Sequence, residues 1–345
     1  MGALDGDYRF VLLGPGGIPV SGSSGPAVPA LVSRPADAPA IEIRDLRKRY
    51  GRIEALAGLT MTVGRGEVFG FLGPNGAGKT TAVKLLLGLA RPTSGGGRIL
   101  GAPIGDLATR RRVGYLPELF RYQPWLRARE VLALHADLIG LPRGERRASL
   151  DDVLGLVGLA DRAGDLVGGF SKGMQQRLGL AVALVGRPDL VFLDEPTSAL
   201  DPLGRIDVRG IIREVRARGS AIFLNSHLLT EVELVCDRVA IVARGKVVAE
   251  GTLDDVLGAP EVRVRADGLD PDTLAAVERF GRPSLDGDEL TIRGLDPDLV
   301  PDLVAALVGR GARIRGVDAG RRSLEERFID LVGRADDAAA GGAAA

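Results

Sequence analysis

The chain has 345 residues, enough for two domains with a large buried core. Apolar residues make up 45% of it and charged residues 26%, which is typical of a folded globular protein and excludes wholesale disorder. The 45 basic and 45 acidic side chains cancel, so no net charge favours nucleic acid or an anionic membrane, and we expect no nucleic-acid partner. The single cysteine, Cys236, excludes an internal disulfide and a metal site built from several cysteines.

Membrane and export signals are not evident in the sequence. No apolar run approaches the roughly 20 residues that a helix needs to cross a bilayer. The first residues carry neither the basic region nor the apolar region of a secretory signal. We therefore expect a cytosolic protein.

Residues 1–39 are rich in Gly, Pro, Ala and Ser and predict a disordered lead-in. After it, apolar strand patterns alternate with helical patterns, which predicts an α/β fold with a mainly parallel sheet. The expected strands are 41–43, 59–63, 67–72, 112–116, 190–193, 221–224, 238–242 and 246–249. The expected helices are 80–89, 129–139, 145–157, 173–185, 203–218 and 228–235.

The pattern changes after Pro260. Strands are expected at 261–265, 289–292 and 312–317, and helices at 272–280 and 298–309. This order predicts a small second domain of βαβαβ type over residues 261–333. The Ala- and Gly-rich residues 334–345 predict a disordered tail.

A glycine-rich segment lies between the strand expected at 67–72 and the helix expected at 80–89. It reads Gly73-Pro74-Asn75-Gly76-Ala77-Gly78-Lys79-Thr80-Thr81 and matches the pattern G-x-x-x-x-G-K-[ST]. Such a loop turns its backbone N–H groups towards phosphate oxygens, and the N-terminus of the helix adds a positive dipole end. Lys79 can reach the β- and γ-phosphates, and the Thr80 hydroxyl can bind Mg²⁺. A chance glycine-rich turn is the alternative, and the loop alone indicates only a nucleotide phosphate.

Two adjacent acids, Asp194 and Glu195, follow the buried strand expected at 190–193. They would lie at the carboxyl edge of a parallel sheet, where ligands bind in α/β folds. There Asp194 can hold Mg²⁺, and Glu195 can act as the general base for an attacking water. The simpler alternative is a strand that ends in a solvated acidic turn.

Further motifs appear in a fixed order along the chain. They are Lys48-Arg49-Tyr50-Gly51, Phe170-Ser171-Lys172-Gly173-Met174-Gln175-Gln176-Arg177, Ser198-Ala199-Leu200-Asp201 and Asn225-Ser226-His227. With the phosphate loop and the acid pair, they make residues 41–258 resemble the ATP-binding subunit of ABC transporters. In that family the segments are the adenine-stacking aromatic, the signature loop, the D-loop and the switch histidine.

The resemblance implies a P-loop nucleotide-binding cassette over residues 40–258. This fold has a mainly parallel sheet core, an antiparallel β part and a helical subdomain at about 119–185. The chain would add a small α+β domain at its C-terminal end. ATP and Mg²⁺ would be the cofactors, with Thr80, Asp194 and Glu118 near the metal.

The resemblance also assigns roles to residues. Catalysis would depend on Glu195, His227 and Lys79, with His227 contacting the γ-phosphate and the attacking water. The residues expected to contact ATP are Tyr50, Gly73, Pro74, Asn75, Gly76, Ala77, Gly78, Lys79, Thr80, Thr81, Glu118, Ser171, Gly173 and Asp201.

Simpler roles remain open for several of these residues. Ser171 can also be the N-cap of the following helix. His227 can be an ordinary surface histidine, and Tyr50 can belong to the core. His135 has no motif around it and is expected to be structural.

Two departures from the wider family pattern stand out. Phe170, Lys172 and Met174 replace the first, third and fifth residues of L-S-G-G-Q, and Glu118 stands where the family's Q-loop carries Gln. Both departures resemble the branch of exporters typified by daunorubicin-resistance ATPases. The aromatic residues that follow, Phe120, Tyr122 and Trp125, are expected either to face a permease or to pack in the core.

The resemblance implies an ATPase that drives export through a separate membrane permease. It would work as a head-to-tail dimer with a second ATP-binding subunit, possible as a homodimer, and would be cytoplasmic and peripheral on the inner face of the membrane. A soluble ABC ATPase acting on DNA or ribosomes is the alternative. The sequence specifies neither the transported molecule nor the role of the C-terminal domain.

Overall fold

The computed structural model describes residues 38–198, 200–258, 261–320 and 323–342. The expected lead-in therefore lies, up to residue 37, outside the described residues. A six-stranded sheet with the order β10-β9-β3-β8-β7-β6 forms the centre of the cassette, and all neighbouring pairs are parallel except β9 and β10. This confirms the expected mainly parallel α/β core. Its strands are β3 (Val68–Leu72), β6 (Val113–Leu116), β7 (Leu190–Asp194), β8 (Ala221–Asn225), β9 (Arg238–Ala243) and β10 (Lys246–Thr252).

A second, antiparallel sheet has the order β2-β1-β4-β5. Its strands are β1 (Ile41–Tyr50), β2 (Ile53–Val63), β4 (Ser94–Ile99) and β5 (Ala102–Pro103). The sequence did not predict β4, because its glycine run is typical of a turn. In the structure this run permits close approach to β1: a Cβ atom on Gly95 would lie 1.9 Å from the Asp45 carbonyl oxygen.

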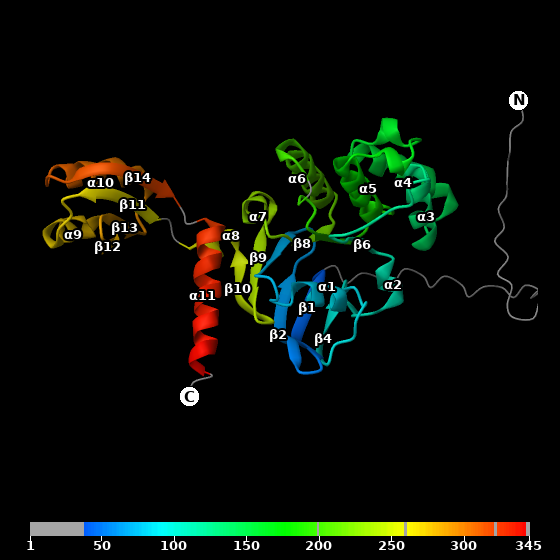
Figure 1. The fold of residues 1–345 in the computed structure, drawn as a ribbon, viewed down its shortest axis with the longest axis horizontal. Coiled ribbons are helices and arrows are strands. Elements are labelled where there is room, and N and C mark those ends of the chain that lie inside the picture. The colour runs from blue at the N-terminus through cyan, green and yellow to red at the C-terminus, as the bar shows by residue number, and fades with distance from the viewer. Residues whose placement is uncertain (1–37, 199, 259–260, 321–322, 343–345) are drawn as a thin grey trace, which may run out of the picture. The chain divides into compact units, whose positions relative to one another are not determined.

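The central strands β3, β7 and β8 are buried along their whole length, with alternate side chains entering two apolar clusters. One cluster joins the central sheet to α1 and the antiparallel sheet. The other joins the central sheet to α3, α4, α5, α6, α7 and α8. Among these, α3, α4 and α5 pack on one another and form a helical group (Figure 1). The cassette helices are α1 (Lys79–Leu86), α2 (Leu107–Arg110), α3 (Ala128–Leu138), α4 (Arg143–Leu156), α5 (Lys172–Leu184), α6 (Pro202–Ala217), α7 (Leu229–Val235) and α8 (Leu253–Leu257), with 3-10 turns η1 (Ala160–Arg162) and η2 (Val167–Gly169).

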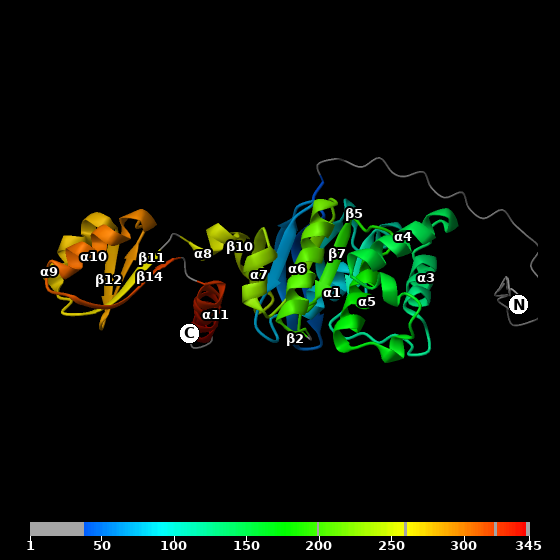
Figure 2. The same cartoon turned by 90° about the horizontal axis from the view of Figure 1, so that it is seen from above.

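Residues 261–320 form a four-stranded antiparallel sheet with the order β12-β13-β11-β14. Two helices cover one face and enclose a separate apolar cluster (Figure 2). The expected βαβαβ order lacked β12, which forms a hairpin with β13. The elements are β11 (Glu261–Asp267), α9 (Pro271–Val277), η3 (Glu278–Phe280), β12 (Arg282–Asp286), β13 (Glu289–Arg293), η4 (Pro297–Leu299), α10 (Val300–Val308) and β14 (Arg313–Gly320).

A long helix, α11 (Leu324–Gly342), corrects two expectations. Residues 334–342 belong to this helix, where a disordered tail was expected, and alanine, the best helix former, is the most frequent residue among them. Helix α11 contacts α7, α8, β9 and β10 of the cassette, whereas its residues up to 333 were expected in the second domain. Apolar side chains at helical spacing carry this packing: Leu324, Phe328, Leu331 and Val332. The final residues, 343–345, lie outside the described part of the chain.

The helices were compared with the length and hydropathy of a membrane-spanning helix. Within the described residues, no helix combines the length and the apolar character needed to cross a bilayer. The longest helix, α11, carries charged side chains such as Glu325 and Glu326 in its first turn.

Candidate active site

The glycine-rich loop connects β3 to the N-terminus of α1. Gly78, the N-cap of α1, has a φ of 101°, and a Cβ atom there would lie 2.4 Å from the Ala55 carbonyl oxygen. The Lys79 ammonium folds back over the loop and donates hydrogen bonds to the carbonyl oxygens of Gly73 (2.6 Å) and Pro74 (3.1 Å). Burial lowers the pKa of Lys79, while the nearby Glu195 and Asp194 oppose this effect. The loop thus combines a helix N-terminus with a partly desolvated cation, which suits an anionic ligand.

Asp194 ends β7 beside the phosphate loop and is only 7% exposed. Its Oδ1 atom accepts a hydrogen bond of 2.5 Å from Nδ2 of Asn225, which ends the adjacent strand β8. Burial raises the pKa of Asp194, the Asn225 hydrogen bond lowers it, and the Glu118 carboxylate raises it. The backbone N–H of Glu118 also lowers the pKa of Asp194. Glu118, two residues after the end of β6, thus acts on Asp194 at the same acidic edge.

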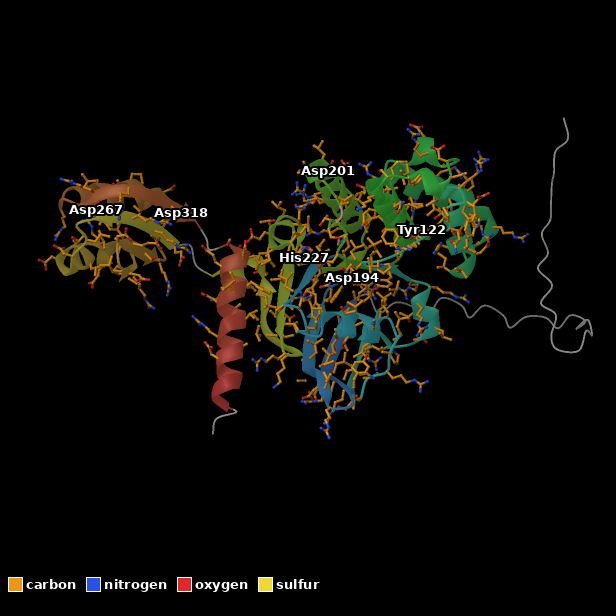
Figure 3. The ribbon with its side chains drawn as sticks, viewed as in Figure 1. Tyr122, Asp194, Asp201, His227, Asp267 and Asp318 are labelled. Carbon is orange, nitrogen blue, oxygen red and sulfur yellow. The ribbon has the colours of Figure 1, made fainter. Side chains whose placement is uncertain are left out.

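Glu195 is buried and contacts His227 twice. Its Oε1 atom accepts a hydrogen bond of 2.9 Å from the His227 backbone N–H, and its Oε2 atom lies 2.7 Å from Nδ1 of the imidazole. The His227 side chain is largely exposed, so it can meet a ligand while Glu195 orients it. Figure 3 shows Asp194 and His227 in the centre of the cassette, where the parallel strands end. Glu195 is therefore not part of a solvated acidic turn.

Ser171 and Asp201 lie at other helix ends. Ser171 is exposed and caps α5, accepting a hydrogen bond of 3.2 Å from the Met174 N–H, as the sequence predicted for an N-cap. Asp201 caps α6 through a 2.7 Å hydrogen bond from Gly204, and it lies apart from Asp194 and His227 (Figure 3). Among the described residues, no hydrogen bond joins either of them to the phosphate loop or to the acid pair.

The remaining residues that were predicted to contact ATP are exposed or half-buried. Tyr50, at the end of β1, is 48% exposed, and Lys48 Nζ lies 4.7 Å from the centre of its ring, so Tyr50 does not pack in the core. Thr80 is exposed at the start of α1, and Thr81 is half-buried behind it. Gly173 lies in the first turn of α5, whose N-cap is Ser171. Within the described residues, no hydrogen bond joins this end of α5 to the phosphate loop. Ala199 of the D-loop segment lies outside the described residues.

The aromatic segment divides between the core and the surface. Phe120 and Tyr122 pack on the core, and their rings contact each other with centroids 5.4 Å apart. Trp125 is exposed, as is Leu119. His135 donates a hydrogen bond of 2.8 Å from Nδ1 to the Val131 carbonyl oxygen and meets Tyr122 edge-on, which fits a structural role.

Two contributors to the site were not predicted from the sequence. One is the Asn225 side chain, and the other is Gln176 of α5, whose Nε2 atom donates a hydrogen bond of 2.8 Å to the Pro196 carbonyl oxygen. The available signal was the polar Asn225 directly after the apolar residues of β8, at the same sheet edge as Asp194.

The residues present fit a Mg²⁺ ion bound together with phosphates. Asp194, Glu118 and Thr80 offer the oxygen ligands that Mg²⁺ prefers. The edge carries three carboxylates, those of Asp194, Glu195 and Glu118, against one lysine, which favours a cation. Within the described residues, no group of three or more His, Cys, Asp or Glu side chains forms a closed metal site, so oxygen atoms of a ligand would have to complete the coordination.

The fold and the site together define a P-loop ATPase of the cassette type. The family model described as ABC transporter matches residues 56–198. An uncharacterized ABC transporter ATP-binding protein of Nostoc sp. is 42% identical over 85% of this chain and 89% of its own length. The chain belongs to the ATP-binding subunits of ABC transporters, a family of ATPases.

Two further relatives are named for transport. The Nod factor export ATP-binding protein I of Burkholderia orbicola is 36% identical over 85% of this chain and 97% of its own length. The bacitracin transport ATP-binding protein BcrA of Bacillus licheniformis is 42% identical over 62% of this chain and 70% of its own length. The relatives thus include ATP-binding proteins of the exporter branch, as the signature and Glu118 predicted.

Solved structures agree with the fold. A structure titled as the ATP binding subunit of an ABC transporter is 35% identical and covers 63% of this chain and 91% of that chain, with a TM-score of 0.59. A cassette described as a dimeric post-hydrolysis state bound to ADP and Pi is 25% identical, covers 62% of this chain and 99% of that chain, and has a TM-score of 0.56.

Proposed function

We propose that this protein hydrolyses ATP with Glu195 as general base and uses the energy to drive export through a separate membrane permease. The observation that carries the proposal is the pairing of buried Glu195 with exposed His227, at 2.7 Å between side chains, beside the phosphate loop. A carboxylate in this position can take a proton from water, and an imidazole held by it can face the γ-phosphate.

The roles of the other residues follow from their positions. The loop from Gly73 to Thr81 holds the phosphates, and the Lys79 ammonium exchanges its two carbonyl contacts for phosphate oxygens. Tyr50 offers an exposed ring for the adenine. Mg²⁺, when bound near Thr80, Asp194 and Glu118, would neutralise part of the phosphate charge. Glu195 accepts a proton from the attacking water as the bond to the γ-phosphorus forms and ADP leaves.

The test is a pair of substitutions. Glu195→Gln keeps the shape of the side chain but removes the base, so turnover should fall roughly 10²–10⁴-fold while ATP binding persists. Lys79→Ala should weaken nucleotide binding itself. ATP binding and phosphate release are measured for both variants. Near-normal phosphate release by the glutamine variant would assign the base role to another group.

The transport part of the proposal is supported by the relatives. Proteins named for Nod factor export and bacitracin transport share the cassette, and exposed Leu119 and Trp125 offer apolar contacts to a permease on the inner face of the membrane. Glu118 precedes this segment and its charge raises the pKa of Asp194, so it can link the permease to the metal site. A second ATP-binding subunit would complete the site, and the related cassette bound to ADP and Pi is described as dimeric.

A further inference from the structure

Asn225 is the last residue of β8 and is only 5% exposed. Its side-chain Nδ2 atom donates to Asp194 Oδ1 at 2.5 Å, and its backbone carbonyl accepts from the Glu195 N–H at 2.8 Å. We propose that Asn225 is a positioning residue of the ATPase site, which orients the Asp194 carboxylate for the Mg²⁺–nucleotide complex. This inference rests on the proposed ATP hydrolysis.

Of the two hydrogen bonds of Asn225, only the one to Asp194 depends on the side chain. The backbone contact to Glu195 continues the parallel pairing of β7 and β8 and would survive any side chain at position 225. It holds Glu195 where φ is 54°, a left-handed conformation that is strained for a residue with a side chain. The side-chain contact to Asp194 is specific to a hydrogen-bond donor. A substitution at position 225 therefore tests the Asp194 contact alone.

The chemistry fixes how the amide is turned. Asp194 presents an oxygen at 2.5 Å, and only the NH₂ end of the Asn225 amide can donate to it. The opposite rotation would place two acceptor oxygens against each other. Asn225 thus fixes one carboxylate oxygen of Asp194, as outer hydrogen-bond partners do for metal ligands.

Stability alone does not account for an asparagine here. The Asn225 Oδ1 atom is buried and has no hydrogen-bond partner among the described residues. A buried acceptor without a donor destabilises the folded state, whereas a leucine of nearly the same size would bring no such atom. Within the described residues, the one hydrogen bond that the amide side chain makes goes to Asp194, so the benefit of asparagine lies at the active site.

The experiment compares Asn225→Leu with Ser220→Ala. Ser220 directly precedes the other end of β8, is also buried, and donates to the Pro188 carbonyl oxygen at 2.7 Å, so it controls for the loss of a buried hydrogen bond away from the site. A fluorescent ATP analogue is titrated with and without Mg²⁺ (in EDTA). For Asn225→Leu we expect unchanged affinity in EDTA, but about a tenfold higher Mg²⁺ concentration for half-maximal tightening of binding. Ser220→Ala should match the wild type in both.

A double-mutant cycle with Asp194→Asn tests the route of the effect. If Asn225 acts through Asp194, adding Asn225→Leu to Asp194→Asn should change the Mg²⁺ dependence no further. An unchanged Mg²⁺ requirement in the single variant, or an equal further loss in the double variant, would overturn the inference. Asn225→Ala serves in the same assays if the leucine variant does not fold.

The outcomes separate this inference from the proposed function. A wild-type protein that releases no phosphate from ATP contradicts the proposed function. A wild type that hydrolyses ATP, with an Asn225→Leu variant of normal Mg²⁺ dependence, contradicts only the role of Asn225.

Discussion

Single residues of the phosphate loop are constrained by backbone geometry. Gly78 combines a φ of 101° with a site where an added Cβ would lie 2.4 Å from the Ala55 carbonyl oxygen and 2.8 Å from a methyl group of Leu56. The first of these atoms belongs to the backbone and the second to a buried leucine, so neither can move aside easily. Any side chain at position 78 must therefore shift the loop that carries Lys79.

We expect Gly78→Ala to weaken ATP binding at least tenfold, because the added Cβ displaces the loop and so disrupts its array of N–H donors. Gly210→Ala is the matched control, since Gly210 lies in α6 with open space around it, and alanine there should stabilise the fold by about 0.5–1 kcal/mol. Nucleotide affinity and thermal unfolding are measured for both. Wild-type affinity in Gly78→Ala would show that the loop tolerates the side chain.

The sequence predicted some site residues and missed others for a physical reason. Lys79, Asp194 and Glu195 lie in contiguous motifs, so local order along the chain was sufficient to propose them. The hydrogen bond from Asn225 to Asp194 joins two strands, and it becomes visible only when β7 and β8 are known to be neighbours. Contacts between strands therefore required the structure.

At the scale of elements, strands with continuous apolar runs were predictable, whereas a glycine-rich strand, a hairpin strand and a C-terminal helix were not. The buried strands β7 and β8 were expected almost at their observed limits. The strand β4 was missed because Ser94–Ile99 contains a glycine run, and β12 because only its pairing with β13 makes it a strand. Helix α11 was missed because its packing partner, the cassette, lies far back in the sequence.

Helix α11 carries a prediction about stability. Leu324 is fully buried in the cassette core, and its backbone N–H donates to the Glu233 carboxylate of α7, whereas Ile329 of the same helix is 63% exposed. Leu324→Ala should lower the free energy of unfolding by about 2–4 kcal/mol, and Ile329→Ala should change it by less than about 0.5 kcal/mol. Thermal unfolding followed by circular dichroism provides the comparison. Equal effects would show that α11 does not pack on the cassette in solution.

At the scale of the whole molecule, the site surrounds a nucleotide from one side only. The phosphate loop, Asp194 and Glu195 gather at one sheet edge, while Ser171 is an exposed N-cap on α5 with no hydrogen bond to them among the described residues. A helix N-terminus with free N–H groups is an anion site that a second subunit can present. One cassette can thus hold the ATP, and another can close it.

This arrangement predicts that ATP joins two chains. Because Glu195→Gln should bind ATP without hydrolysing it, this variant with ATP and Mg²⁺ should shift from monomer to dimer in light-scattering measurements. Adding Ser171→Arg should restore the monomer, since the larger side chain fills the place of the γ-phosphate on α5. Adding Ser323→Arg instead should leave the dimer intact, because Ser323 is an equally exposed serine that accepts from a first-turn N–H, but on α11. Dimerisation of the Ser171→Arg variant as strong as that of Glu195→Gln alone would exclude Ser171 as the closing group.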